Sequence, residues 1–216
     1  MPATKSASKS KKKSIFSVHP SIAYAQAVVA NMKAKTGRSL EEWIKFVKTD
    51  GPRDEVAQRE WLKKEHKLGT NYAWWIAGRV HGKGEDDTDP QAYLRSAEKY
   101  VQDMFSGKRE VLRPIYEKLI QIGIALGDDV KVCPCQTMVP LYRENVFAQI
   151  KPSTNTRVDL GLCLRQAKSP PKRIIPTGGL EKGDRITHRI PITSTDEIDA
   201  EVQRWMKAAY TEAAPK

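Results

Sequence analysis

The sequence has few cysteines and no long apolar run. Its three cysteines, Cys133, Cys135 and Cys163, are odd in number, which excludes a disulfide framework and suits a reducing compartment. No stretch approaches the roughly 20 apolar residues that a membrane-spanning helix needs. The basic start of the chain is not followed by an apolar segment, so no secretory signal is predicted. We therefore expect a soluble, cytoplasmic protein.

Signatures of known catalytic and metal sites are also missing. The chain has no phosphate-binding loop with a Gly-Lys-Ser/Thr ending, no paired Cys-x-x-Cys knuckles and no readable catalytic triad. Cys133-Pro-Cys135 has a spacer of one residue, which favours thiols packed at a strand end over a metal site. The sequence therefore predicts no catalytic residues, no metal and no cofactor.

Positive charge is abundant and unevenly placed. The net charge is +11 over 216 residues. Residues 1–16 contain five lysines and no acid, whereas residues 84–129 contain ten acids and six bases. The first of these segments has almost nothing to bury and predicts a disordered basic tail. A basic balance of this kind favours polyanionic partners such as nucleic acid.

Residues 17–81 have the apolar spacing of a small helical domain. Ser39-Leu-Glu-Glu42 matches a capping box, in which a serine and a glutamate satisfy the first backbone amides of a helix. Gly37 is placed to end the preceding helix. The pattern predicts four short helices, at about 20–35, 39–48, 53–66 and 72–80.

A polar linker at residues 82–89 separates this domain from a predicted α+β domain at residues 90–212. Helical spacing first covers residues 90–105 and 111–126, and alternation with a period of two follows. Strands are predicted at 130–132, 146–151, 157–165 and 187–192. Ser194-Thr-Asp-Glu197 is a second capping-box pattern, which predicts the start of a final helix. The fold class is α+β: a helical bundle, then a mostly antiparallel sheet flanked by helices.

Both domains resemble known bacterial families. Gly37-Arg-Ser-Leu-Glu-Glu-Trp43 and Trp61-Leu-Lys-Lys-Glu-His66 resemble a helical domain of unknown function, family 4287. Val130-Lys-Val-Cys-Pro-Cys135 and Val146-Phe-Ala-Gln-Ile-Lys151 resemble a second domain of unknown function, family 5655, which is sometimes labelled a predicted transport protein. The resemblance implies a two-domain bacterial protein and transfers no activity and no site residue.

The strongest candidate site is basic. Residues 130–193 contain 11 bases and four acids, and a sheet face lined by Arg and Lys can follow a phosphate backbone. Tyr142 and Phe147 are the only aromatic residues in this stretch, which argues against base stacking. The favoured function is therefore a non-enzymatic protein that binds nucleic acid through its phosphates. The residues predicted to make contact are Lys131, Arg143, Lys151, Arg157, Arg173, Lys182, Arg185 and Arg189.

Two other classes of function stay open. One is a small-molecule or anion-binding module, enzymatic or not, in which Cys135 meets His188, the only histidine of the C-terminal domain. The other is an adaptor that binds a protein partner through the acidic middle and an exposed tryptophan. The sequence does not define the oligomeric state. The residues of the alternative pocket are Cys135, Tyr142, Lys151, Arg185 and His188.

Trp74 and Trp75 are adjacent on one predicted helix. Side chains one residue apart on a helix diverge by about 100°. The two indoles therefore cannot face one core together, and one of them is expected to be exposed or to dock on the C-terminal domain. Packing between the domains is preferred over a ligand platform.

Overall fold

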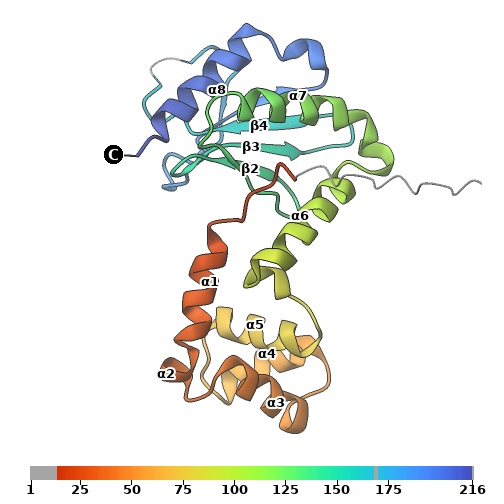
Figure 1. Cartoon of the computed structure of the whole chain (residues 1–216), viewed down its shortest axis with the longest axis vertical. Helices are drawn as coiled ribbons and strands as arrows, with labels where there is room; N and C mark the ends of the chain where they lie inside the picture. Colours follow the sequence, from red (N-terminus) through yellow and green to blue (C-terminus); the bar gives the residue numbers. More distant parts are fainter. Residues whose placement is uncertain (1–13, 168–169, 216) are drawn as a thin grey trace, which may run out of the picture.

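The computed structural model describes residues 14–167 and 170–215. A bundle of short helices lies at one end and a helix-covered sheet at the other, with two helices running between them (Figure 1). This arrangement confirms the predicted α+β class. The α-helices are α1 (Ser21–Ala30), α2 (Met32–Thr36), α3 (Leu40–Asp50), α4 (Glu55–Lys64), α5 (Thr70–Val80), α6 (Pro90–Met104), α7 (Arg113–Ile124) and α8 (Ala200–Glu212). The 3-10 helices are η1 (Glu85–Asp87), η2 (Gly107–Leu112) and η3 (Thr195–Glu197).

The bundle is built from α2 to α5, whose apolar faces meet in a small core. Trp43, Leu62 and Ile76 are buried in it. At the start of α3, the Ser39 hydroxyl accepts the amide of Glu42 at 3.2 Å, and the Glu42 carboxylate accepts the amide of Ser39 at 2.7 Å. The predicted capping box is confirmed.

The first predicted helix, at about 20–35, is two helices in the structure. The chain turns at Asn31, between α1 and α2. The side-chain amide of Asn31 donates to the carbonyl of Ala27 at 2.9 Å, and such a local bond competes with regular helical bonding. Gly37 ends α2 with φ of 82°, a left-handed conformation that glycine adopts without strain.

Six strands form one sheet in the order β1-β2-β3-β4-β6-β5. Neighbouring strands are antiparallel throughout this order. The predicted hairpin is confirmed as β3 and β4, whereas β2 and β5 were not predicted. The strands are β1 (Lys131–Val132), β2 (Val139–Tyr142), β3 (Val146–Pro152), β4 (Val158–Leu162), β5 (Ile175–Pro176) and β6 (His188–Ile192).

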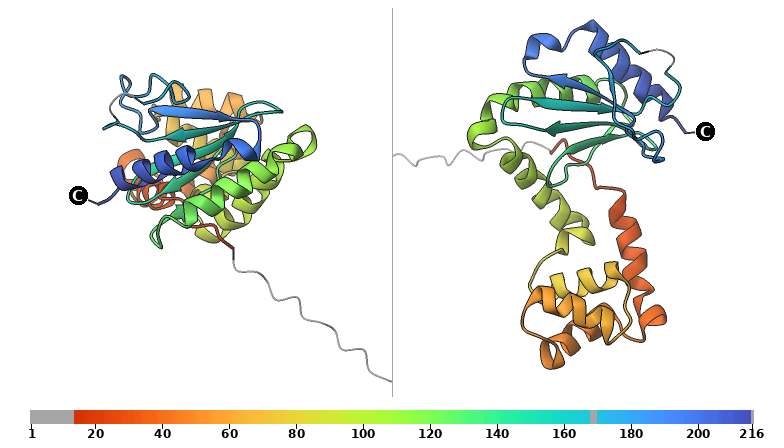
Figure 2. Two further views of the ribbon diagram at one scale, coloured as in Figure 1. Left: turned by 90° about the horizontal axis from the view of Figure 1, so that it is seen from above. Right: turned by 180° about the vertical axis from the view of Figure 1, so that it is seen from behind.

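Helices α7 and α8 cover one face of this sheet (Figure 2) and enclose the largest core of the molecule. Leu141, Ile150 and Leu160 are fully buried there. The register of β2 against β3 shifts just after Leu141, and Phe147 beside this irregularity is also fully buried. A Cβ atom on Gly123 of α7 would lie 2.6 Å from Leu141 Cδ1, so a glycine permits the close approach of helix and sheet.

The final helix begins later than the capping box predicted. The Ser194 hydroxyl accepts the amide of Asp196 at 3.2 Å and so caps the short helix η3. The chain leaves η3 before a new cap forms at Asp199, whose carboxylate accepts the amide of Val202 at 3.0 Å. The predicted start of the final helix was wrong by five residues, from Ser194 to Asp199, because Asp199 provides a second, independent start signal.

Helices α1 and α6 connect the helical bundle to the part of the molecule that contains the sheet. Residues 1–13 of the predicted tail lie outside the described residues. Phe16 forms a parallel bridge with Val132 at the edge of the sheet, and α1 then runs toward the bundle. Ile22 of α1 packs with Tyr93 of α6 in a small separate core. The predicted linker between the domains contains η1.

Candidate functional site

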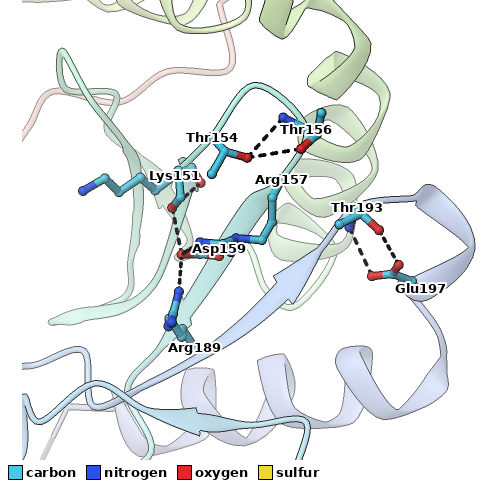
Figure 3. A network of polar contacts seen from close by, with 9 residues as sticks. Lys151, Thr154, Thr156, Arg157, Asp159, Arg189, Thr193 and Glu197 are labelled. Atoms are coloured by element: carbon cyan, nitrogen blue, oxygen red, sulfur yellow. Dashed lines mark hydrogen bonds and ion pairs between the residues drawn. The ribbon is translucent and has the colours of Figure 1, made fainter.

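Three of the predicted cations lie on the face of the sheet opposite α7 and α8. Lys151 of β3 is the register partner of Asp159 in β4. Arg157 Nε lies 2.8 Å from one Asp159 oxygen, and Arg189 Nη1 of β6 lies 2.7 Å from the other. The Ser153 hydroxyl donates to the same carboxylate at 2.8 Å. We call Arg157, Asp159 and Arg189 the cationic clamp (Figure 3).

The charges of the clamp favour an anion as its ligand. The Asp159 side chain is 13% exposed and each arginine side chain is 35% exposed, so the acid lies beneath two guanidinium groups. Lys151 is exposed, and its side chain extends away from Asp159 (Figure 3). These four residues together have a net charge of +2. The carboxylate holds both arginines in place and leaves their outer edges accessible.

The pKa of Asp159 reflects a competition. Burial acts to raise it, but hydrogen bonds from Ser153 and Arg189 and the charges of both arginines outweigh burial. The pKa therefore lies below its ordinary value, and Asp159 is ionised at neutral pH. The clamp keeps its geometry over the physiological range of pH.

Replacing Asp159 by asparagine is expected to lower stability by about 1–3 kcal/mol at neutral pH, since two arginines lose a charged partner. A lowered folded-state pKa stabilises the fold above the unfolded pKa, near 4, and this contribution is lost as pH falls through the folded pKa. The gap in melting temperature between wild type and Asp159→Asn should thus be largest at pH 7 and shrink below about pH 4. Asp128→Asn, at an exposed carboxylate, is the control. A difference in melting temperature that stays the same from pH 7 to below pH 4 would contradict the stabilising role of the ionised Asp159.

Two of the predicted contact residues are held elsewhere by acids. Arg143 Nε donates to Asp129 at 2.7 Å, and its guanidinium stacks on the Tyr210 ring at 4.3 Å. Arg173 Nη1 donates to Asp199 at 2.6 Å, at the start of α8. These two arginines join loops to the C-terminal helix and do not share the carboxylate of the clamp, and their role as nucleic-acid contacts stays a prediction.

The remaining predicted cations are exposed but scattered. Lys131 lies in β1, at the edge of the sheet opposite to β5. Lys182 and Arg185 lie in the connection between β5 and β6, where Arg185 lines a shallow hollow with Gln149. Lys131 is therefore remote from the clamp, whereas the loop of Arg185 borders the clamp's face.

The alternative pocket does not form. Cys135 follows β1 and Tyr142 ends β2, but His188 lies in β6, four strand spacings from β1, or about 19 Å. Lys151 lies in β3 and Arg185 in the β5–β6 connection, so neither brings Cys135 and His188 together. Burial also raises the pKa of Cys135, which keeps the thiol protonated and poorly nucleophilic. The alternative in which Cys135 meets His188 is not realised, because the strand order separates β1 from β6.

A different histidine approaches Tyr142. His19 Nε2 lies 3.2 Å from the Tyr142 hydroxyl, and His19 Nδ1 accepts the Ser21 amide at 3.1 Å. Nδ1 is therefore unprotonated and Nε2 donates to the tyrosine. Burial lowers the pKa of His19, in agreement with a neutral ring. Nothing in the local sequence signals this pairing across 123 positions.

Fold and surface define a two-domain protein, a helical bundle followed by an α+β domain with a cationic sheet face. Residues 101–213 match the domain of unknown function DUF5655, and residues 24–81 match the domain of unknown function DUF4287. The first match spans more than half of the chain, which therefore belongs to the DUF5655 family. No curated protein and no solved structure matches the chain. Every helix within the described residues is too short or too polar to traverse a lipid bilayer.

Proposed function

We propose that this protein binds nucleic acid through its phosphates, and that the cationic clamp and Lys151 make the central contacts. The observation that supports the proposal is the pairing of Arg157 and Arg189 with one shielded carboxylate, beside an exposed lysine on the same face. Guanidinium groups bind phosphate oxygens in a bidentate manner, and arginines fixed in advance lose less entropy on binding. A bacterial cytoplasm is the compartment that fits this function.

The rest of the surface is consistent with sequence-independent binding. Aromatic side chains are scarce on the sheet, so stacking on bases contributes little there and phosphate contacts dominate. Lys182 and Arg185, next to the clamp's face, extend the positive surface along the β5–β6 connection. Affinity should then depend on ionic strength more than on base sequence.

The test is a fluorescence-anisotropy titration of a labelled oligoribonucleotide and a labelled DNA duplex. Replacing Lys151 and Arg157 together by glutamine removes two cations and keeps the Asp159–Arg189 pair. We expect about tenfold or greater loss of affinity near 0.1 M salt. Replacing Lys45 and Lys48 of α3 by glutamine removes the same charge from the bundle and is the control. Equal affinity of both double variants would refute a role for the clamp.

A further inference from the structure

A cleft lies where the helical bundle meets η1, α6 and the β1–β2 connection. Its volume is about 510 Å³, within the range of pockets that hold small molecules. Side chains from both parts of the chain line it, from Glu55 in α4 to Gln136 after β1. No residue of the cationic clamp is among the lining residues, so the two sites are separate.

The cleft has an aromatic wall formed by Trp74, Trp75 and Tyr100. Trp74 is 54% exposed, although an indole is a large apolar group. The guanidinium of Arg59 lies 3.8 Å from the centre of the Trp74 ring and is held by an ion pair with Glu55. An indole fixed in place and left open to a cavity is a platform on which a planar ring can stack.

Charged groups in the cleft balance one another, which disfavours a highly charged ligand. The lining contains three acids and three bases. Glu55 pairs with both Arg59 and Lys83, and Tyr100 donates to Asp86. An uncharged ligand that forms hydrogen bonds is therefore the better match.

Asp87 provides the acceptor. Within the described residues its carboxylate has no ion-pair partner and no hydrogen bond from a side chain, and it lines the cleft. Burial, and then the charge of Asp86, raise the pKa of Asp87 against the opposing effect of Arg79. Partial loss of water around a carboxylate makes a hydrogen bond from a ligand N–H group favourable. The amide side chains of Asn71 and Gln136 line the same space.

A second cavity, of about 340 Å³, continues from the first. Asp86, Asp87, Tyr100 and Gln136 line both cavities. The second cavity extends past them to the Ser21 hydroxyl at the start of α1. A ligand in the cleft thus has room for a polar substituent directed toward the sheet.

We propose that this cleft binds a nucleoside-type ligand: an uncharged, planar nitrogen heterocycle that stacks on Trp74 and donates an amino N–H to Asp87, with a polar substituent in the second cavity. Binding of this ligand in the cleft is a function separate from phosphate binding at the cationic clamp and does not depend on it. The residues that recognise the ligand come from the bundle, η1 and α6.

Isothermal titration calorimetry of the full chain with adenosine, cytidine, guanosine and uridine tests the proposal. Nucleosides have no phosphate group, so binding at the cationic clamp does not contribute to the measured heat. We expect saturable binding that is insensitive to salt, and a loss of about tenfold or more in Trp74→Ala, because a base stacked on an aromatic side chain loses its platform. Trp74→Phe, which keeps a ring, should retain most of the affinity.

Two further variants sharpen the test. Tyr24→Ala removes an aromatic side chain that is 67% exposed on α1 and lines neither cavity, and it should bind as wild type does. Asp87→Asn should shift the preference from adenosine and cytidine toward uridine, since an amide can donate to a carbonyl. The proposal is overturned if no nucleoside binds at millimolar concentration, or if Trp74→Ala and wild type bind equally.

Discussion

Replacing Trp43 by alanine is expected to cost about 3–5 kcal/mol and to unfold the helical bundle while the sheet stays folded. The Trp43 side chain is 2% exposed, and its ring lies 5.8 Å from that of Phe46 and 5.5 Å from that of His66. Its indole N–H donates to the Thr36 hydroxyl at 2.8 Å. Since the bundle has only a small core of its own, a loss of this size is comparable to its whole stability.

Urea unfolding monitored by amide hydrogen exchange distinguishes the two parts of the chain. In Trp43→Ala, protection should vanish in α3 to α5 and persist in β2, β3 and β4. Trp74→Ala removes a half-exposed indole from the same bundle and should cost less than about 1 kcal/mol. Simultaneous loss of protection in bundle and sheet would show that the two parts fold as one unit, against this expectation.

The Phe147→Ala substitution should destabilise the sheet by a similar amount, about 3–5 kcal/mol, and leave the bundle protected. Phe147 is fully buried beside the irregularity of β2–β3 pairing, and its ring meets the edge of Tyr210 from α8 at 5.6 Å. The alanine would leave a cavity between the sheet and its covering helix. Neighbouring strands cannot close it without losing their register.

The same exchange experiment measures this effect in β3, β4 and α8. Val111→Ala, at a side chain that is 70% exposed in η2, is the matched control and should change stability by less than about 0.5 kcal/mol. A Phe147→Ala protein as stable as the control would mean that the packing of α8 on the sheet is not as described.

Patterns among residues close together in the sequence predicted many of the helices and strands. The elements that were missed depend on contacts between residues far apart in the sequence. The capping box at Ser39 and the alternation in β3 and β4 act through neighbours in sequence, so they were readable. Strand β2 was missed because Pro140 interrupts it, and proline usually marks an edge or a break. In the structure the Pro140 carbonyl still accepts the Cys133 amide at 3.0 Å, so the strand keeps its place beside β1.

In the candidate sites, too, the residue types could be predicted from the sequence but the contacts between distant residues could not. The abundance of Arg and Lys on the sheet was predictable, but the partner of each cation was not. Arg157 and Asp159 are two positions apart, whereas Arg189 reaches the same carboxylate from 30 positions away. The cleft draws on positions from Glu55 to Gln136, and its formation depends on how α1 and α6 join the two parts.

The salt dependence of nucleic-acid binding tests the central claim most directly. The logarithm of affinity is measured against the logarithm of salt concentration for wild type and for the Lys151→Gln, Arg157→Gln double variant. Each lost phosphate contact lowers the slope by about 0.9 on a DNA duplex, so the variant should show a slope smaller by about 1.8. A variant with an unchanged slope, or a wild-type protein that does not bind, would contradict phosphate recognition by this face of the sheet.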